Sequence, residues 1–341
     1  MKSNCGTTGM RKQFKRVMVT GGAGYVGSNL VPKLLAADYQ VAVLDLYIYG
    51  DVFANLASNP NLTEVKGDLR HPSDVQRALA GCDAVIHLAC ISNDPSFDLN
   101  PDLGRSINYD CFRPLVHAAK RAGVRRFIYA SSSSVYGVKS EPEVTEDLAL
   151  QPLTDYSKFK ALCEDVLMEE RESGFVTVIL RPATVCGYAP RLRLDLTVNI
   201  LTSLGVNNGR ITVFGGEQLR PNIHVEDMTD LYALLLEAPD NAVDGKVWNA
   251  GYHNLKVREI AEMVRSQVGP HVELVVTPSN DHRSYHVSSA KLERDLGYVA
   301  QRSVDNAIRD LRDAFATGKV PNPATDDRYY NIKRMQTRKL Q

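Results

Sequence analysis

The sequence lacks the features that would mark a membrane protein, a secreted protein or a nucleic-acid-binding protein. Its 341 residues carry 40 basic and 40 acidic side chains, so no net charge attracts polyanions, and an anionic ligand must be bound locally. No apolar run approaches the roughly 20 residues of a membrane helix. The first sixteen residues are polar and basic. We therefore expect a flexible segment at residues 1–14 that is neither a signal peptide nor an anchor.

Metal-binding patterns are also missing. The six cysteines are scattered without a Cys-x-x-Cys pair, and none of the eight histidines has metal-ligand spacing, so we expect no metal. Scattered cysteines that stay reduced favour a cytoplasmic protein. His87 lies in an apolar run and is predicted to be a core residue rather than a base.

What the sequence does contain is an alternation of short β-branched runs with segments that have apolar residues at helical spacing. Segments 29–39 and 74–82 are examples of the helical pattern. Strands alternating with helices predict βαβ crossovers, and hence an α/β fold with a Rossmann-type, doubly wound parallel sheet. The expected strands are residues 17–20, 41–45, 63–68, 84–89, 126–131 and 176–181.

This alternation changes after Pro182, where we expect a smaller C-terminal α/β substrate lobe. An Asn-Gly pair at residues 208–209 predicts a turn before a short strand. Further helices are predicted at residues 191–205, 224–238, 254–268 and 288–298. The expected division is a cofactor-binding domain at 15–188, to which some later elements return, a lobe at 189–320 and a loosely held tail at 321–341.

A glycine-rich turn directly follows the first expected strand. Gly21, Gly24 and Gly27 have G-x-x-G-x-x-G spacing at a strand-to-helix junction, where backbone N–H groups can approach a pyrophosphate. Asp45 follows about 20 residues later, where a carboxylate binds the adenosine ribose and repels a 2′-phosphate. The turn therefore predicts NAD rather than NADP. Asp68, after the third strand, either orients the adenine or caps the next helix.

Tyr156 and Lys160 stand four residues apart in a predicted helix and therefore share one face. A neighbouring ammonium and an oxidised nicotinamide would lower the pKa of the phenol from its usual value near 10, and make it a base near neutral pH. A surface Tyr and Lys on one helix would explain this pair alone. The serine run at residues 131–134, which ends an expected strand, and the glycine turn favour catalysis.

Together these motifs resemble the extended short-chain dehydrogenases/reductases, and within them the NAD-dependent nucleotide-sugar epimerases and dehydratases. The resemblance covers roughly residues 15–315 and implies NAD as cofactor, a nucleotide-diphosphate sugar as substrate, and a homodimer formed by the helices around residues 108–121 and 156–170. The motifs follow the family's order: TGGAGYVG, GDL, HLA, SSSSVYG, YSKFK, RPATVCG, RPNIHVEDM and SSAKLERDLGY.

The resemblance also implies roles for individual residues. Tyr156 would remove the proton of a sugar hydroxyl, Ser132 would hydrogen-bond the reacting oxygen and relay the proton, and Lys160 would bind the nicotinamide ribose. The implied cofactor contacts are Gly21, Gly24, Tyr25, Val26, Gly27, Asp45, Asp68, Leu69, Leu88, Ala89, Ala130, Tyr156 and Lys160. The implied substrate contacts are Asn108, Ser132, Ser133, Asn199, Arg220 and Arg283.

Several reactions are consistent with this family. We expect an epimerase, in which hydride leaves a sugar carbon, a 4-keto sugar forms, and hydride returns to its other face. Net oxidation or reduction at C4 is the alternative. Family 4,6-dehydratases carry an Asp-Glu pair where this chain has Ser133 and Ser134, which disfavours elimination. A non-catalytic NAD sensor typically loses the Tyr/Lys pair, which this chain keeps.

Some positions depart from the galactose epimerase pattern. Ser92 replaces a lysine that hydrogen-bonds the cofactor phosphates, Phe159 replaces a serine, Cys186 replaces a tyrosine, and Thr277 replaces an arginine. The stretches RPATVCGYAPRLRLDLTVN, RPNIHVEDM and DHRSYHVSS are more similar to a branch containing a GDP-heptose 4-dehydrogenase, whose tightly held cofactor is reoxidised by a keto acid. This similarity keeps C4 oxidation open.

Overall fold

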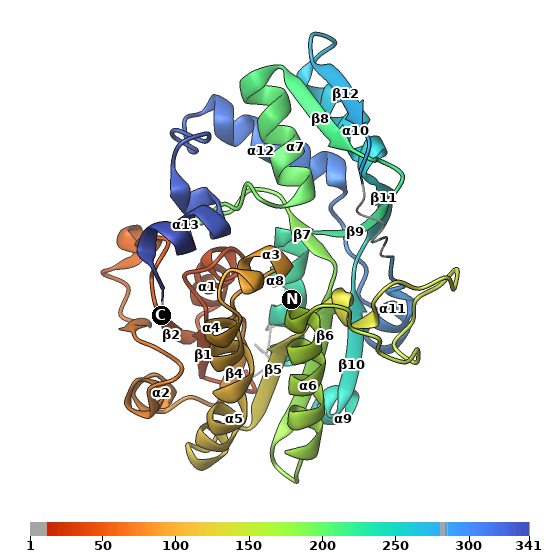
Figure 1. Ribbon diagram of the computed structural model, residues 1–341. Coiled ribbons are helices and arrows are strands. Elements are labelled where there is room, and N and C mark those ends of the chain that lie inside the picture. The colour runs from red at the N-terminus through yellow and green to blue at the C-terminus, as the bar shows by residue number, and fades with distance from the viewer. Residues whose placement is uncertain (1–11, 280–283, 285, 341) are drawn as a thin grey trace, which may run out of the picture.

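The central sheet is parallel throughout, and its strand order reverses once. The computed structural model describes residues 12–279, 284 and 286–340. Its large sheet has the order β10-β6-β5-β4-β1-β2-β3 (Figure 1), and every neighbouring pair is parallel. The doubly wound α/β fold and all six expected strands are confirmed. The strands are β1 (Arg16–Thr20), β2 (Gln40–Asp45), β3 (Leu62–Lys66), β4 (Ala84–His87), β5 (Arg126–Ala130), β6 (Val176–Pro182) and β10 (Lys246–Ala250).

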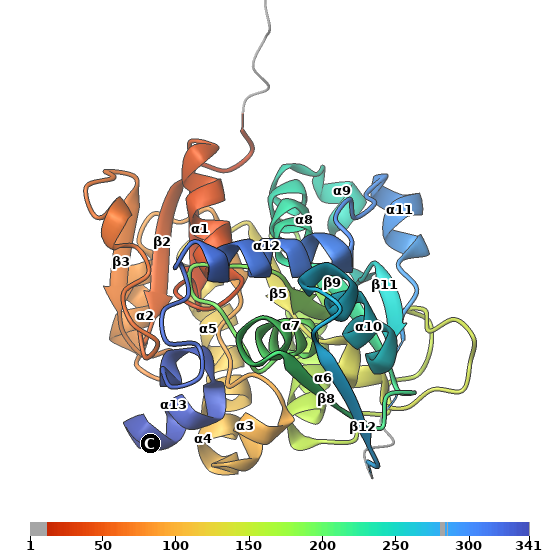
Figure 2. The ribbon, with the colours of Figure 1, turned by 90° about the horizontal axis from the view of Figure 1, so that it is seen from above.

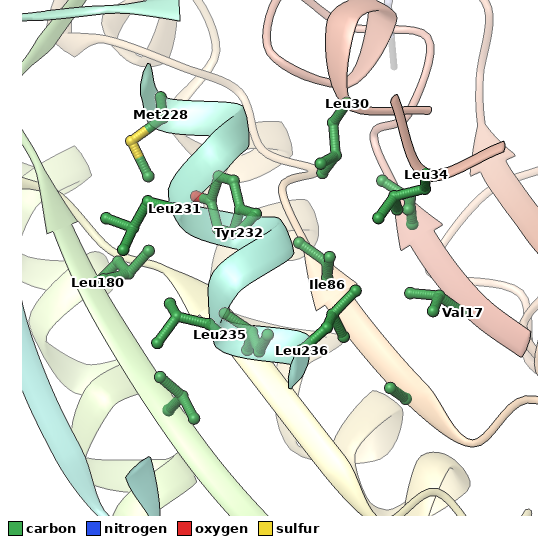
Figure 3. Packing of buried hydrophobic residues seen from close by; sticks show 14 of the residues in the cluster. Val17, Leu30, Leu34, Ile86, Leu180, Met228, Leu231, Tyr232, Leu235 and Leu236 are labelled. Atoms are coloured by element: carbon green, nitrogen blue, oxygen red, sulfur yellow. The ribbon is translucent and has the colours of Figure 1, made fainter. Parts of the chain in front are cut away.

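Both faces of the sheet are covered by helices, and the alternation along each strand decides which side chain meets which face. In β1, Val17 and Val19 pack into one core and Met18 into the other. One face is covered by α1 and α8, and Figure 3 shows Leu231 of α8 beside Leu180 of β6. These covering helices are α1 (Gly27–Ala36) and α8 (Val225–Glu237) on one face, and α2 (Pro72–Leu79), α5 (Phe112–Arg121) and α6 (Asp155–Glu169) on the other.

Elements from late in the chain complete this domain. β10 pairs with β6 through residues such as Trp248 opposite Leu180, and α8 packs on α1. Two short helices, α9 (Asp240–Val243) and α11 (Ala290–Leu296), lie beside β6 and β10. The chain therefore crosses between the two parts of the molecule more than once after residue 189.

The smaller lobe lies at the carboxyl ends of the large sheet (Figure 1). Its core is formed by three helices packed on a two-stranded parallel sheet. A separate three-stranded sheet has the order β11-β9-β7. The elements are β7 (Thr184–Cys186), α7 (Thr197–Asn208), β8 (Arg210–Phe214), β9 (Leu219–His224), β11 (His253–Lys256), α10 (Val257–Val268), β12 (Glu273–Thr277) and α12 (Val304–Ala316).

The helix expected at residues 191–205 is wrong in its first two turns, because α7 begins only at Thr197. Before it, the sequence alternates arginine with leucine, and the chain is not helical. Leu192 and Leu194 are buried in an apolar cluster with Tyr25. Side chains that alternate in this way point to opposite sides, which places the two arginines away from that cluster.

The C-terminal segment is packed rather than loosely held. After the short turn η4 (Asp327–Tyr329), the chain forms α13 (Asn331–Arg338), which lies beside α3 (Asp94–Asp98) and α4 (Pro101–Arg105) in Figure 2. Asn331 and Arg334 are both more than nine-tenths buried. The expected loose tail is thus corrected, because these polar side chains have hydrogen-bond partners far away in the sequence.

Several expectations concern single features of the chain. The N-terminal segment of residues 1–11 lies outside the described residues, and Phe14 is buried. Five of the cysteines are described, and all are free thiols. Within the described ranges, no helix combines the length and apolar content required to cross a bilayer. The same ranges hold no group of three His, Cys, Asp or Glu side chains arranged to hold a metal ion.

Candidate active site

A large cavity of about 540 Å³ lies at the carboxyl ends of the parallel strands. Its walls come from the loops that follow β1, β2, β4, β5 and β6, together with the chain before α7 and part of α8. The cavity therefore spans the point between β1 and β4 where the strand order reverses, which is where open α/β sheets bind ligands.

The glycine turn forms one wall of the cavity, with Gly21, Gly24, Tyr25, Val26 and Gly27 at its surface. Gly21 has a φ of +67°, and a Cβ there would lie 2.7 Å from the Cα of Ala89. A side chain at Gly27 would approach the carbonyl oxygen of Gly22 to 2.4 Å. The glycines thus allow β1, the loop after β4 and the start of α1 to meet closely, as a diphosphate site on a helix N-terminus requires.

The two predicted carboxylates lie at the same end of the cavity but differ in their partners. Asp45 accepts backbone N–H bonds from Ala23 (3.0 Å) and Tyr47 (2.7 Å), which tie β2 to the glycine turn. Burial raises its pKa, opposed by these hydrogen bonds. Asp68 pairs with Arg70 at 2.7 Å. It accepts a bond from the N–H of Arg70, so it does not cap helix α2, whose N-cap is His71.

Ser132, Tyr156 and Lys160 are brought together by β5 and α6. The Thr154–Ser157 capping box starts α6 one residue before Tyr156. Ser132 and Tyr156 line the cavity, and the Ser132 hydroxyl lies 2.8 Å from that of Ser134. Lys160 is 4% exposed and lies behind the wall.

The buried ammonium of Lys160 is held in place from two sides. Its Nζ donates to the carbonyl of Ala130 at 2.6 Å and lies 5.9 Å from the centroid of the Tyr156 ring. The expected helical face shared by tyrosine and lysine is therefore found. The cation is directed at the backbone of β5, where it keeps a positive charge close to the phenol.

The pKa of the Tyr156 phenol is raised, mainly by burial and also by the nearby Cys90 and Asp94. The charge of Arg193 and a hydrogen bond with Ser132 act in the opposite direction. The lowered pKa expected from the sequence is therefore not found in the protein alone. Lowering it requires a further positive charge in the cavity.

The serine run is supported from behind by a buried polar network. Ser131 donates to Glu164 of α6, which forms an ion pair with Arg181 of β6 at 2.7 Å. Arg181 also donates to the hydroxyl of Tyr136 at 2.7 Å. Both charged side chains are less than one-tenth exposed. The network joins β5, β6 and α6, and so fixes the end of the strand that carries Ser132 and Ser133.

The other predicted residues divide into those at the cavity and those elsewhere. Leu69, Leu88, Ala89, Ala130, Ser133 and Arg220 line it. Asn108 instead binds the backbone of Ile91 through both its amide atoms. Asn199 binds Gly187, the carbonyl of Arg193 and the Tyr25 hydroxyl. These two amides organise the protein rather than face the cavity. Arg283 lies outside the described residues.

The core interpretation of His87 is confirmed. Its Nδ1 lies 2.7 Å from the hydroxyl of Thr20, and its ring packs among Phe112, Phe127 and Tyr129. Burial lowers its pKa to about 3, helped by the charge of Lys160. A histidine that stays neutral inside the core is not available as a base.

Three residues at the cavity were missed from the sequence: Arg191, Arg193 and Asn331. The helix expected over residues 191–205 would have placed these two arginines on different faces, because residues two apart in a helix do not lie side by side. The signal that could have revealed them is the alternation Arg-Leu-Arg-Leu, which is typical of extended chain with one apolar side. For Asn331 the sequence holds no comparable signal, because it meets the cavity only through the fold.

Comparison with known proteins agrees with this geometry. The profile of a family described as the NAD dependent epimerase/dehydratase family matches residues 17–251. The UDP-glucose 4-epimerase of Lactobacillus helveticus is 28% identical over 320 residues, covering 86% of this chain and 94% of the relative. A probable UDP-arabinose 4-epimerase of Oryza sativa is 27% identical over 337 residues, covering 89% and 79%.

Solved structures give the same fold. The dTDP-glucose 4,6-dehydratase DesIV of Streptomyces venezuelae, with NAD bound, has a TM-score of 0.81 at 26% identity, covering 90% of this chain and 99% of that one. The UDP-glucose 4-epimerase of Thermus thermophilus, in complex with NAD, has a TM-score of 0.77 at 26% identity, covering 88% and 99%. The relatives thus include both epimerases and a dehydratase.

Proposed function

The chain belongs to the NAD-dependent epimerase/dehydratase family, and from this premise we propose that it is a nucleotide-sugar epimerase that acts through a transient 4-keto sugar, with Tyr156 as the base. The observation that carries the proposal is that a buried phenol and a hydrogen-bonded serine line the cavity that begins at the glycine turn, and that a buried ammonium lies close to the phenol behind the cavity wall. Elsewhere in the family the same fold serves dehydratases, so the reaction must be argued from side chains.

The residues at the cavity fit the cofactor. The glycine turn leaves room for a diphosphate against the N-terminus of α1, and Asp45 lies where the adenosine ribose hydroxyls would bind. When bound, NAD would supply a reversible hydride acceptor for the sugar carbon and a positive charge near the phenol. That charge is the one that the buried Tyr156 requires to lower its raised pKa.

The chain's own groups then handle the proton. Tyr156 takes the proton of the sugar hydroxyl as the carbon is oxidised, and gives it back on reduction. Ser132 hydrogen-bonds both the phenol and the reacting oxygen. Lys160 keeps a fixed charge near the ring, which opposes the cost of a buried phenolate. Arg220, at the far end of the cavity, is proposed to bind the substrate diphosphate.

The position after Ser132 supports epimerisation over elimination. Ser133 and Ser134 line the cavity there, and a hydroxyl cannot replace the carboxyl pair that a dehydratase requires for its second proton transfer. Net oxidation at C4 uses the same first step and differs only in whether hydride returns. The two reactions must therefore be separated by experiment.

The first experiment tests Tyr156→Phe. Loss of a general base predicts a fall in turnover of about 10²–10⁴-fold, while NAD binding stays within a few-fold of wild type because the ring remains. Tyr109→Phe is the matched control, since Tyr109 stacks on Phe159 and does not line the cavity. Turnover that survives Tyr156→Phe would exclude this residue as the base.

The second experiment separates the two reactions. The protein is incubated with UDP-, GDP- and dTDP-linked hexoses, and the sugar is followed by proton NMR while bound cofactor is released by acid and identified by its absorbance. An epimerase gives a new axial or equatorial proton pattern without net reduction of NAD. Turnover that requires a keto acid, with NADH left on the protein when the keto acid is omitted, would contradict epimerisation and establish the dehydrogenase.

Two further expectations remain predictions. A homodimer through α5 and α6 would place the exposed Leu162 at the contact, and light scattering after gel filtration tests it. The cytoplasmic location is tested by fractionation.

A further inference from the structure

Two arginines at the cavity are buried, and each has one guanidinium nitrogen that is unpaired among the described residues. Arg191 is 4% exposed and Arg193 is 8% exposed. The Nε of Arg191 and the Nη2 of Arg193 are buried and have no hydrogen-bond partner among the described residues. Buried guanidinium groups are normally fully paired, since an unpaired donor costs about 1–3 kcal/mol. Both side chains therefore keep donor capacity for an anionic ligand at the cavity.

The remaining contacts orient the two cations toward the cavity. Arg191 lies against the ring of Tyr49 at 3.5 Å and donates to the side chain of Asn331, both neutral groups. Arg193 donates to Asp195 at 2.9 Å and to Ser92 at 3.0 Å. Burial lowers the pKa of Arg191 to about 10, so it is cationic at neutral pH.

Their place in the fold identifies the ligand. The backbone N–H of Arg191 donates to the Ser28 hydroxyl at 3.1 Å, in the first turn of α1. Arg193 reaches Ser92 in the loop after β4, and both arginines line the cavity that the glycine turn also lines. The arginines thus share one cavity with the N-terminus of α1, where the turn leaves room for a diphosphate. Guanidinium groups bind phosphate oxygens in a bidentate way.

The C-terminal segment holds this arrangement closed. Asn331 accepts from Arg191, donates to Ser92 at 2.9 Å, and through its N–H binds Asp195 at 3.0 Å. Arg334, one turn later, donates to the carbonyl of Ile48 in the loop after β2. Figure 1 shows α13, from the end of the chain, beside the red and orange ribbon of its early part.

We propose that Arg191 and Arg193 form a clamp on the diphosphate of the bound dinucleotide, and that Asn331 of the C-terminal segment is the latch that keeps the clamp closed. This inference rests on the proposed function only for the identity of the cofactor. In the galactose epimerase pattern a lysine stands at the position of Ser92. Arg193 reaches the cavity beside Ser92, so the clamp supplies the positive charge that this serine lacks. It also accounts for a C-terminal helix whose polar side chains are buried.

The experiment measures NAD binding to the full-length protein without turnover, so it does not depend on which reaction the enzyme performs. Arg191→Met removes the cation and keeps its volume, and we expect NAD affinity to fall about 10–100-fold. The melting temperature of the cofactor-free variant should be equal to or above that of wild type, since an unpaired buried charge is gone. Arg193→Lys keeps a charge for Asp195 but loses the fork, and should weaken NAD about tenfold.

The latch has its own readout. Asn331→Ala should speed NAD dissociation, measured by displacing NAD from the preloaded protein with an excess of labelled NAD. Arg77→Gln is the control, because Arg77 is exposed and pairs with Asp74 on α2. It should change neither affinity nor dissociation.

Three results would overturn the proposal. Unchanged NAD affinity in both arginine variants would show that the two arginines do not bind the dinucleotide diphosphate. A lower melting temperature of cofactor-free Arg191→Met, with normal NAD affinity, would assign the arginine a structural role. Weaker binding of UDP, GDP or dTDP with unchanged NAD affinity would move the arginines to the substrate diphosphate.

Discussion

The ion pair between Glu164 and Arg181 is predicted to be the main buried electrostatic support of the serine run at residues 131–134. Its two side chains are 5% and 7% exposed, and the guanidinium reaches both carboxylate oxygens at 2.7–3.2 Å. Removing one partner of such a pair leaves the other charge buried and unpaired, which costs about 3–5 kcal/mol. We therefore expect Glu164→Leu to lower the free energy of unfolding by that amount.

The double variant tests the reason for this loss. In Glu164→Leu/Arg181→Met both charges are gone and the volume is nearly kept, so the free energy of unfolding should return to within about 2 kcal/mol of wild type. We assign the remaining loss of unfolding free energy to the Ser131 hydroxyl, because it loses its hydrogen-bond acceptor. Lys158→Ala is the matched control on the same helix, because its pair with Asp155 is half exposed and should contribute less than about 0.5 kcal/mol.

Urea unfolding measures these values, with far-UV circular dichroism and tryptophan fluorescence followed together. The single tryptophan, Trp248, is fully buried in β10 and reports on the same sheet as Arg181. A cost below about 1 kcal/mol for Glu164→Leu would refute the reasoning. So would a double variant that loses the sum of both single losses, since that pattern means the two charges do not interact.

Three further predictions concern single positions. Gly137→Ala should cost several kcal/mol, because φ is +68° and the new Cβ would lie 2.1 Å from the carbonyl oxygen of Gln151; at Gly123, with φ +82° and open space, alanine should cost only about 1 kcal/mol, and equal losses in urea unfolding would contradict this. The folded pKa of His87 is about 3, so between pH 6.5 and 3 only the unfolded chain binds its proton. The free energy of unfolding therefore decreases as the pH is lowered through that window, by about 2 kcal/mol at pH 5. His87→Gln should remove this part of the pH dependence, and an unchanged pH dependence in the variant would contradict the lowered pKa of His87. Asp45→Asn should shift the NADP/NAD affinity ratio toward NADP about tenfold or more in calorimetric titrations, and an unchanged ratio would show that the carboxylate does not face the 2′ position.

Structural features that depend on residues close together in the sequence were predictable. β1 to β6 follow from apolar runs, and the alternation of Val17, Met18 and Val19 decides which face each side chain covers. The glycine turn is a local backbone requirement, seen in the positive φ of Gly21. Tyr156 and Lys160 share a face because a helix repeats every 3.6 residues.

Other site features were not predictable. Asn199 was assigned to the substrate, yet its amide is occupied by Gly187, Tyr25 and the carbonyl of Arg193. The pKa of Tyr156 was expected to be lowered by Lys160 together with an oxidised nicotinamide ring, and in the protein alone burial raises it. Both outcomes depend on which groups surround a side chain in space, and spacing along the chain does not contain that information.

The sequence by itself determined the parallel sheet, the glycine turn and the tyrosine–lysine face, because each is set by residues a few positions apart. Only the tertiary structure decided that Arg191, Arg193 and Asn331 meet at one cavity. Asn331 lies 140 residues from Arg191 and 239 from Ser92, and it contacts both. Such a meeting is fixed by the packing of α13 against the rest of the fold, which depends on the whole chain rather than on a local repeat.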